Sequence, residues 1–537
     1  MKRHPQLCRG GASLLAVFFV ALFAVLAVSF AAMSNMNVQM SRNHRDVSAA
    51  QAAAESGLEY ANYLVASYVP PTAAYNPRNT VTESEARTTL GYFANHVQTV
   101  LAGSPLLGGH GIYYDGVAGE LRVPATGTMS LASGANGGFS LHLRFEAGLA
   151  PAPHHVIVTS TGALGAVQRT VGLTFPIKKD GQVLEYAVAS RGRMWIVGDS
   201  TIHGGIYSSW NRPEISPFKL AAASTVEGTI NTVLSRQAIE AEGYQLETLD
   251  ENGNPIYDEN GERVVGANDM IQGEHEGINY EAPSQNMPGM SINDYDTSMY
   301  KSQVTSLPSS SVRRTEYFPH AAGDYTRPRD SGSRQLSRYV YENQTYNNAA
   351  LPANRNALFK NCTFEGVLYV DCATSGSTYY NNVRFENCTF HGTIVSNVPQ
   401  VFKWMHNCLY FTGSATFENR ATAEATILAP HLNVNLGNCN PAAGENNVLR
   451  GAIVGGIVDV RGNAEVFGTI ISMCDTSQWS SGYVTNIGAT TEDGGSETVE
   501  PGDIGTIHIT PDPANMLPSG IKTPIVLARD GNSYVEY

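Results

Sequence analysis

"RGGASLLAVFFVALFAVLAVSFAAMSN", residues 9–35, decides how this chain begins to fold. Residues 12–32 are apolar except for Ser13 and Ser29, and no charged residue or histidine occurs between Gly10 and Ser41. A helix of this length spans about 31 Å at ~1.5 Å per residue, enough to cross the hydrocarbon core of a bilayer. The stretch therefore predicts a membrane anchor. The alternative is a cleaved secretory signal, whose apolar region is usually shorter, about 7–15 residues.

The charges in front of the apolar run predict its orientation. Lys2, Arg3 and Arg9 precede the run, and no acidic residue lies among them. Because positively charged flanks stay on the cytoplasmic side of a membrane, we expect a cytoplasmic N-terminus and an extracytoplasmic remainder of the chain.

The helix is predicted to continue well beyond the membrane. Residues 33–69 contain one glycine and no proline, and Pro70-Pro71 then terminates the helix. Apolar residues recur at spacings of 3, 4 or 7, which is the pattern of a helix packed along one side. These residues are Met36, Met40, Val47, Ala54, Leu58, Ala61, Val65 and Tyr68. We therefore expect one helix with a transmembrane half, 12–32, and an amphipathic half, 33–69.

The first 60 residues or so also carry a family resemblance. The Arg9-Gly10 pair, the apolar run, "NHRD" (43–46) and "AAESGL" (53–58) resemble the N-terminus of type IV pilins, and most closely that of PilX-like minor pilins. This resemblance implies a prepilin-type leader, 1–11, that a prepilin peptidase cuts between Gly11 and Ala12. It implies as partners other pilin subunits, the inner-membrane assembly machinery and membrane lipid.

Two residues of the helix bear on packing within a filament. Most major pilins carry glutamate at mature position five, where this chain has Ala16. That departure weakens a major-subunit interpretation more than a minor-subunit one, because PilX-like members often lack the glutamate too. Glu55, inside "AAESGL", is either a solvated helix residue or a contact between filament subunits.

Residues 70–180 predict an α+β pilin-like head. Thr82 and Glu85 have the spacing of a capping box, and Gly103 can stop the helix that follows. Alternating segments then predict an antiparallel sheet: "GELRVPA" (119–125), "FSLHLRFEA" (139–147), "HHVIVTSTGAL" (154–164) and "VQRTVGLTFPIKK" (167–179).

Beyond residue 180 the chain is predicted to be mainly β. "LFKNCTFEGVLYV" (358–370) and "VRFENCTFHGTIV" (383–395) are near copies. Such repeats with inward aliphatic residues predict a right-handed parallel β-helix-like solenoid over 181–232 and 351–475. Residues 233–350, with 18 acidic residues against 9 Lys and Arg, are expected to form an acidic, loop-rich and removable insertion. Residues 476–537 are expected to form a C-terminal β tail.

Six cysteines fall in the last third of the chain: Cys362, Cys372, Cys388, Cys408, Cys439 and Cys474. In a solenoid they would stack either as a ladder of buried thiols or as disulfides, since neighbouring coils lie about 4.8 Å apart. No cysteine pair has the spacing of a zinc site. The sequence predicts no metal, cofactor or catalytic site.

Composition and motifs then limit the function. A formal net charge of −14 argues against nucleic acid as a partner. His203 and His391 precede glycines but have no acidic partner nearby in the sequence, so we expect ordinary coil residues. The leading hypothesis is a non-enzymatic, membrane-anchored minor pilin or pseudopilin, displaying its solenoid for adhesion, assembly or contact with a surface polymer. The alternatives are a cell-surface β-helix protein outside any filament and a polysaccharide-degrading β-helix enzyme.

Overall fold

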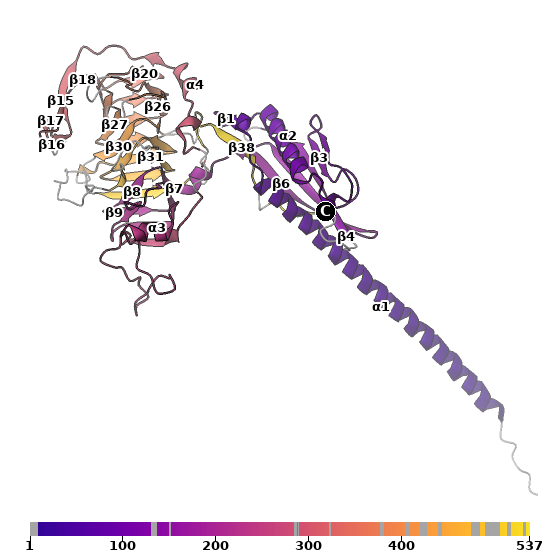
Figure 1. Cartoon of the computed structure of the whole chain (residues 1–537). Helices are drawn as coiled ribbons and strands as arrows, with labels where there is room; N and C mark the ends of the chain where they lie inside the picture. Colours follow the sequence, from indigo (N-terminus) through magenta and orange to yellow (C-terminus); the bar gives the residue numbers. More distant parts are fainter. Residues whose placement is uncertain are drawn as a thin grey trace, which may run out of the picture. The chain divides into compact units, whose positions relative to one another are not determined.

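The computed structural model of the chain divides into two compact units (Figure 1). Unit 1 comprises residues 1–74, 81–178 and 525–537, and unit 2 comprises residues 75–80 and 179–524. The structure describes residues 9–129, 137–149, 152–283, 287, 289–321, 324–375, 381–402, 407–418, 427–438, 443–473, 484–488, 505–512, 517–529 and 533–537.

Unit 1 begins with one long helix, α1 (Arg9–Ala66), of 58 residues or about 87 Å at ~1.5 Å per residue. The prediction of a single continuous helix is confirmed, and it ends four residues before Pro70. Its C-terminal part packs on the sheet of unit 1, where Ala50, Ala54, Leu58 and Leu64 are buried. Burial begins only at Ala50, so the predicted apolar stripe is covered in its second half alone.

A second helix, α2 (Glu83–Val100), follows with the predicted capping box. The Thr82 side chain accepts a hydrogen bond from the backbone N–H of Glu85, and the Glu85 carboxylate accepts one from the backbone N–H of Thr82. This reciprocal pair satisfies two of the N–H groups that a helix start leaves unpaired. Leu90 and Phe93 of α2 join the same buried apolar cluster as Leu58 of α1.

The sheet of unit 1 is antiparallel in the predicted strands. Its order is β1-β38-β6-β5-β4-β3-β2, and β39 also pairs with β6. Its strands are β2 (Tyr113–Asp115), β3 (Glu120–Val123), β4 (Gly137–Glu146), β5 (His155–Leu164), β6 (Val167–Lys179), β38 (Thr523–Leu527) and β39 (Val535–Glu536). The edge strand β1 (Tyr75–Asn76) and the first two residues of β38 belong to the residues of unit 2. The alternation of buried and less buried residues along β5 explains why the sequence pattern identified this sheet.

The C-terminal residues do not form one separate tail over 476–537, as the sequence predicted. Strand β38 lies between β1 and β6 in the sheet order, and Ile525 and Leu527 are buried in the apolar cluster of unit 1. Strand β37 belongs to unit 2 instead. The end of the chain is therefore shared between the two units, and unit 2 is inserted in the sequence between β6 and the last strands of unit 1.

Unit 2 is built from two large sheets whose pairings are almost all parallel. The first contains β7 (Tyr186–Ser190), β9 (Asp199–Ile202), β10 (Gly205–Ser208), β12 (Thr225–Thr232), β13 (Glu274–Asn279), β14 (Thr305–Ser306), β19 (Thr345–Tyr346), β20 (Ala349–Leu351), β22 (Thr363–Phe364), β23 (Leu368–Val370), β25 (Thr389–Phe390), β26 (Ile394–Ser396), β28 (Ala415–Phe417), β29 (Ile427–Ala429), β31 (Asn447–Arg450), β32 (Ile453–Gly455), β34 (Ala464–Phe467), β35 (Ile470–Ser472) and β37 (Thr506–Thr510). The second contains β8 (Arg193–Ile196), β11 (Phe218–Leu220), β15 (Arg313–Phe318), β18 (Arg334–Glu342), β21 (Ala357–Lys360), β24 (Asn382–Glu386), β27 (Cys408–Thr412), β30 (Asn433–Asn438), β33 (Val458–Val460) and β36 (Val484–Ile487).

The register between successive strands follows the sequence repeat. Phe359 pairs with Phe385, and Phe385 pairs with Phe411. Their rings stack at centroid distances of 5.4 and 4.9 Å in the core of unit 2. The near copies in the sequence are therefore neighbouring strands of one sheet, and identical side chains stack because the repeat places them in register.

The order of strands does not follow the order of the chain. Strand β8 pairs with β36, although almost 300 residues separate them, and β7 pairs with β35. The first strands of unit 2 thus lie beside its last strands. In the second sheet, the order of strands runs from β15 and β18 at one edge to β8 and β11 at the other.

The expected insertion, 233–350, is not a removable excursion. It contributes β13, β14, β18 and β19 to the parallel sheets, as well as α3 (Arg236–Ala241) and α4 (Ser298–Lys301). Met290, Tyr295 and Tyr300 are buried against outward-facing apolar residues of the first sheet, including Val395 and Leu428. Strand β13 pairs with β12, and strand β14 pairs with β20. The residues that connect β13 to β14 cover the outward-facing apolar residues named above.

Candidate functional site

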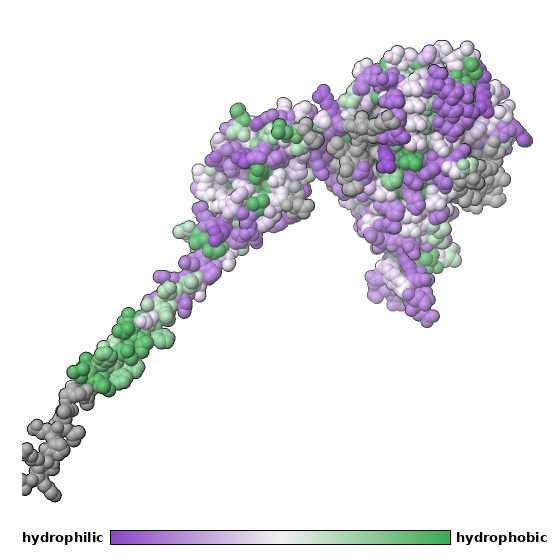
Figure 2. Space-filling view, turned by 180° about the vertical axis from the view of Figure 1, so that it is seen from behind, coloured by the Kyte–Doolittle hydropathy of each residue, from purple (hydrophilic) through white to green (hydrophobic). Residues whose placement is uncertain are grey.

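The first half of α1 is an exposed apolar surface. Every side chain from Ser13 to His44 is exposed, and the most apolar part of the helix reaches a mean hydropathy of 2.9. Figure 2 shows this apolar band on the helix. An isolated helix of this composition is stable in lipid but not in water, so α1 is long and apolar enough to anchor the chain in a membrane.

The residues predicted from the pilin resemblance all lie in α1. Gly11 and Ala12 are in its first turns, and Ala16 is exposed in the apolar half. Glu55 is exposed in the half that packs on the sheet, where its carboxylate accepts a hydrogen bond of 3.0 Å from the Gln51 amide. That bond gives Glu55 a role within its own helix, while its exposure leaves it available to a neighbour.

Small residues explain how the helix meets the sheet. A Cβ on Gly162 of β5 would lie 2.1 Å from the Ala50 carbonyl oxygen and 2.4 Å from the Ala54 backbone nitrogen. Any side chain at position 162 would therefore force α1 away from β5. The alanines before and within "AAESGL" therefore serve close packing of this helix on its own sheet.

The described cysteines are free thiols. Cys362, Cys372, Cys388 and Cys408 are buried and unbridged, while Cys439 and Cys474 lie outside the described residues. Asn361 and Asn387, which precede two of them, adopt φ values of 50° and 53°, a left-handed conformation that asparagine tolerates better than most residues. The Asn-Cys repeat thus places asparagine at a turn and the next side chain in the core.

The two histidines singled out in the sequence do have acidic partners. His391 Nδ1 lies 3.0 Å from Glu365 and its Nε2 lies 3.1 Å from Glu418, and His203 Nδ1 lies 2.7 Å from Glu227. We expected ordinary coil residues at both positions, and these acidic partners were not identified from the sequence. Each partner is 24 to 27 residues away and lies on a neighbouring turn of the repeat, which a search of the local sequence misses.

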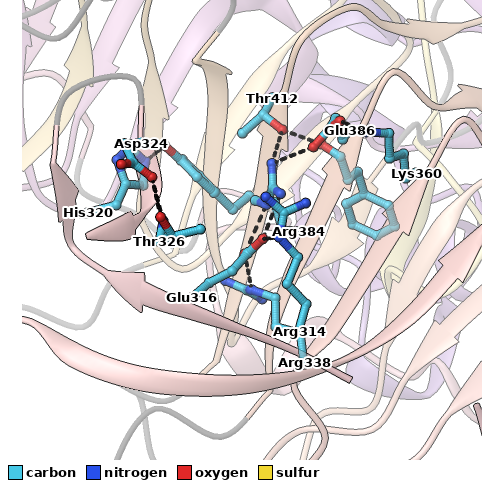
Figure 3. Close-up of polar contacts among 12 residues, drawn as sticks. Arg314, Glu316, His320, Asp324, Thr326, Arg338, Lys360, Arg384, Glu386 and Thr412 are labelled. Atoms are coloured by element: carbon cyan, nitrogen blue, oxygen red, sulfur yellow. Dashed lines mark hydrogen bonds and ion pairs between the residues drawn. The ribbon is translucent and has the colours of Figure 1, made fainter. Parts of the chain in front are cut away.

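Sequence reasoning also missed a buried cluster of arginines (Figure 3). It lies under a segment that we call the flap, which comprises β15 to His320–Ala321 (β16) and Asp324–Pro328 (β17). Three guanidinium groups converge on one carboxylate of the flap, that of Glu316: Arg384 at 2.8 Å, Arg338 at 2.6 Å and Arg314 at 3.3 Å. Glu316, Arg338 and Arg384 are fully buried.

Arg384 has further partners on the sheet. Its Nη1 donates to Thr412 Oγ1 at 3.1 Å and pairs with Glu386 at 2.9 Å, and Glu386 also pairs with Lys360. The sequence offers one signal for this cluster. Arg338 lies inside the strand "RQLSRYVYE" (334–342) and Arg384 lies inside the strand "NVRFE" (382–386), each among apolar residues.

Burial changes the proton affinity of this cluster. Removal from water lowers the pKa of Arg338 to about 10, although the charge of Glu316 opposes the shift. Burial also lowers the pKa of His320, and the nearby charge of Arg384 adds to that effect. His320 Nε2 lies 2.8 Å from the Tyr410 hydroxyl, so a neutral imidazole joins the flap to β27.

Comparison with known proteins gives little further information. No family model matches the sequence, and no curated protein matches it. Among solved structures, a competence-associated pilin, ComZ from Thermus thermophilus, is similar at 13% identity, with a TM-score of 0.23, over 92% of this chain and 98% of its own. An ice-binding protein from the Antarctic ascomycete Antarctomyces psychrotrophicus is similar at 9% identity, with a TM-score of 0.17, over 58% of this chain and 98% of its own. TM-scores this low assign no fold to the chain.

Proposed function

We propose that the chain is a non-enzymatic, membrane-anchored minor pilin or pseudopilin of a type IV pilus or related secretion filament, of the PilX-like kind. The exposed half of α1 anchors the chain in the membrane and makes its contact with the filament. Unit 2 is displayed outside the membrane for adhesion or assembly.

The observation that carries this proposal is the division of α1 into two halves. Its second half is buried on an antiparallel sheet from Ala50 onward, whereas its first half is bare. Residues 33–44 extend about 18 Å beyond a 12–32 membrane segment at ~1.5 Å per residue, and Met33, Met36 and Met40 are exposed there. A membrane covers the first segment, and helices of other subunits are the natural cover for the second.

The leader and orientation follow from the same helix. Prepilin peptidase removes residues 1–11 by cutting between Gly11 and Ala12, and Lys2, Arg3 and Arg9 keep that end in the cytoplasm. The mature chain then sits in the inner membrane, with its bulk on the extracytoplasmic side, and meets other pilin subunits and the assembly machinery.

Unit 2 is a right-handed β-helix in this proposal. Support comes from the parallel pairing of strands one repeat apart and from the stack formed by Phe359, Phe385 and Phe411. A β-helix presents long, rigid faces, which suit contact with a surface polymer. The chain's net charge of −14 does not suit nucleic acid.

Filament membership is tested by fractionating cells that produce the chain. We expect the native chain in both the membrane and the sheared filament fraction, and Gly11→Asp, which blocks leader removal, in the membrane fraction alone. Glu59→Gln, an exposed change elsewhere on α1, is the matched control and should fractionate like the native chain. Absence of the native chain from sheared filaments would favour a surface protein outside any filament. The purified chain should also release no new chain ends from polysaccharides.

A further inference from the structure

Unit 2 has two ends, which lie at opposite edges of its sheets. In the second sheet, β15 lies at one edge and β11 at the other. Residues 236–281 follow on from the β11 edge, because Leu220 of β11 pairs with Ile271 and β13 pairs with β12. Residues 305–334, which include β14 and β15, lie at the opposite edge. Figure 1 shows α3 and β15 at opposite ends of this unit. We call residues 236–281 the acidic end and residues 305–334 the basic end.

The acidic end carries unpaired negative charge. It holds twelve acidic residues against two arginines, Arg236 and Arg263, which already pair with Glu240 and Glu247. Six of its exposed glutamates form no ion pair with any described residue: Glu242, Glu251, Glu259, Glu262, Glu274 and Glu276. This surface therefore favours a positively charged partner.

The basic end has the opposite charge on its surface. It holds five arginines against three acidic residues, and one of the three, Glu316, is buried. Arg313, Arg327 and Arg334 are exposed and form no ion pair with any residue that the structure describes. The Arg313 guanidinium lies over the Tyr339 ring, 3.3 Å from its centroid, which holds the arginine in place without neutralising its charge.

Exposed apolar side chains accompany the charges at both ends. At the acidic end, Tyr257, Val264 and Val265 are 61%, 37% and 45% exposed and lie on the same hairpin. At the basic end, Val312 is 58% exposed and directly precedes Arg313. Apolar and aromatic side chains grouped within a charged surface are typical of surfaces that contact another protein.

We propose that unit 2 of one chain docks end to end on unit 2 of a second copy, with the acidic end of one copy against the basic end of the next. The exposed glutamates then meet Arg313, Arg327 and Arg334, and the apolar side chains of both ends leave water in the same contact. Because the two contacting surfaces differ, each copy keeps one free end, and further copies can add in a row.

Local charge decides this contact, rather than the charge of the whole chain. The net charge of −14 makes two copies repel each other at long range. At physiological ionic strength, however, exposed charges more than about 8 Å apart are largely screened. Surfaces in contact are therefore governed by the charges that face each other, which are opposite here. Because exposed ion pairs are individually weak, the contact should depend on several of them and be sensitive to salt.

This inference goes beyond the proposed function, because it concerns unit 2 and needs neither leader removal nor a filament. The full chain in detergent micelles is studied by analytical ultracentrifugation at low and at high salt. We expect complexes of two or more chains at low salt, and a tenfold increase in salt should weaken association at least tenfold.

Two variants with reversed charge test the two ends. The basic-end variant combines Arg327→Glu and Arg334→Glu. The acidic-end variant keeps Asp250 and Asp258, because their carboxylates accept backbone hydrogen bonds within the hairpin. It combines Glu242→Lys, Glu251→Lys, Glu259→Lys, Glu262→Lys, Glu274→Lys and Glu276→Lys. Each variant alone should associate at least tenfold more weakly than the native chain. Glu185→Lys, an exposed reversal in η3 (Gln182–Glu185) next to β7, is the matched control and should associate like the native chain.

A mixture of the two variants separates docking from a loss of folding. The acidic-end variant presents positive charge at both ends and the basic-end variant presents negative charge at both ends, so their mixture should associate as the native chain does. A native chain that stays monomeric at low salt, or a mixture that does not associate, would overturn the proposal. Equal association of the native chain and both variants would overturn it too, since α1 would then be the source. The filament fractionation above is independent of all these outcomes.

Discussion

Gly57 of α1 lies directly against Ser160 of β5: a Cβ built on Gly57 would lie 2.0 Å from Ser160 Oγ and 2.7 Å from the Phe139 ring. This contact brings a 58-residue helix close enough to its sheet to bury Leu58 and Ala61. It gives the glycine of "AAESGL" a physical role, namely the close approach of helix and sheet.

Substitution of Gly57 should therefore destabilise unit 1. Gly57→Ala adds a methyl group where there is no room, and overpacking typically costs about 1–3 kcal/mol, more than the roughly 1 kcal/mol gained in helix propensity. Chemical denaturation of the chain in micelles measures the change. Glu59→Ala, on the exposed side of α1, should change stability little. If Gly57→Ala were as stable as the native chain, the close contact would not be limiting.

The last strands should be needed for unit 1 as well as for the end of the chain. Ile525 is 2% exposed in the apolar cluster of unit 1, so Ile525→Asp places an unpaired carboxylate in that core. We expect limited proteolysis within 137–177 to become rapid. Tyr534→Asp, at an exposed position, is the control. Unchanged protease resistance of Ile525→Asp would show that β38 is dispensable.

The phenylalanine stack should stabilise unit 2. Phe385 is fully buried between Phe359 and Phe411, and truncating a buried phenylalanine to alanine costs about 3–5 kcal/mol. Phe385→Ala should lower the denaturation midpoint of unit 2 clearly. Thr389→Ala, on the outward side of β25, should cost much less. Similar losses for the two variants would contradict the inward placement of Phe385.

Lowering the pH below about 6.5 should reduce the free energy of unfolding of unit 2 before most of its carboxylates take up protons. Burial lowers the pKa of His431 to about 4, and burial together with the charge of Arg263 lowers the pKa of His275 to about 4. Both imidazoles stay neutral when folded and gain a proton when unfolded. Stability should therefore fall as pH drops from 6.5 to 4, by about 1.4 kcal/mol for each pKa unit between the two states. Denaturation midpoints at pH 7 and pH 5 measure this, and His275→Gln should flatten the slope. A midpoint that does not change with pH would contradict it.

Local patterns were enough to predict unit 1 from α1 to β6. The uncharged run and Pro70 predicted the extent of α1 to within a few residues, and Thr82 with Glu85 predicted the start of α2. Alternating residues predicted β4 to β6. These features depend on neighbours within a few positions of the chain, which a single sequence displays directly.

The arrangement of unit 2 depends on contacts that no local pattern encodes. The near copies around Cys362 and Cys388 indicated that strands repeat, but not that β8 pairs with β36. The acidic residues around His391 come from neighbouring repeats, and Glu316 reaches Arg384 across 68 residues. Long-range pairing also decided where β38 lies, so the sequence did not indicate that the end of the predicted C-terminal tail joins unit 1.

The central claim is that residues 9–35 combine a leader with an anchor, and the N-terminal residue of the mature chain tests it most directly. Intact mass and N-terminal sequencing of the chain purified from membranes should give Ala12 as the first residue, with the apolar segment 12–32 retained. An uncut chain, or a chain beginning near Met33, would contradict the account, because neither keeps a processed helix that can pack into a filament.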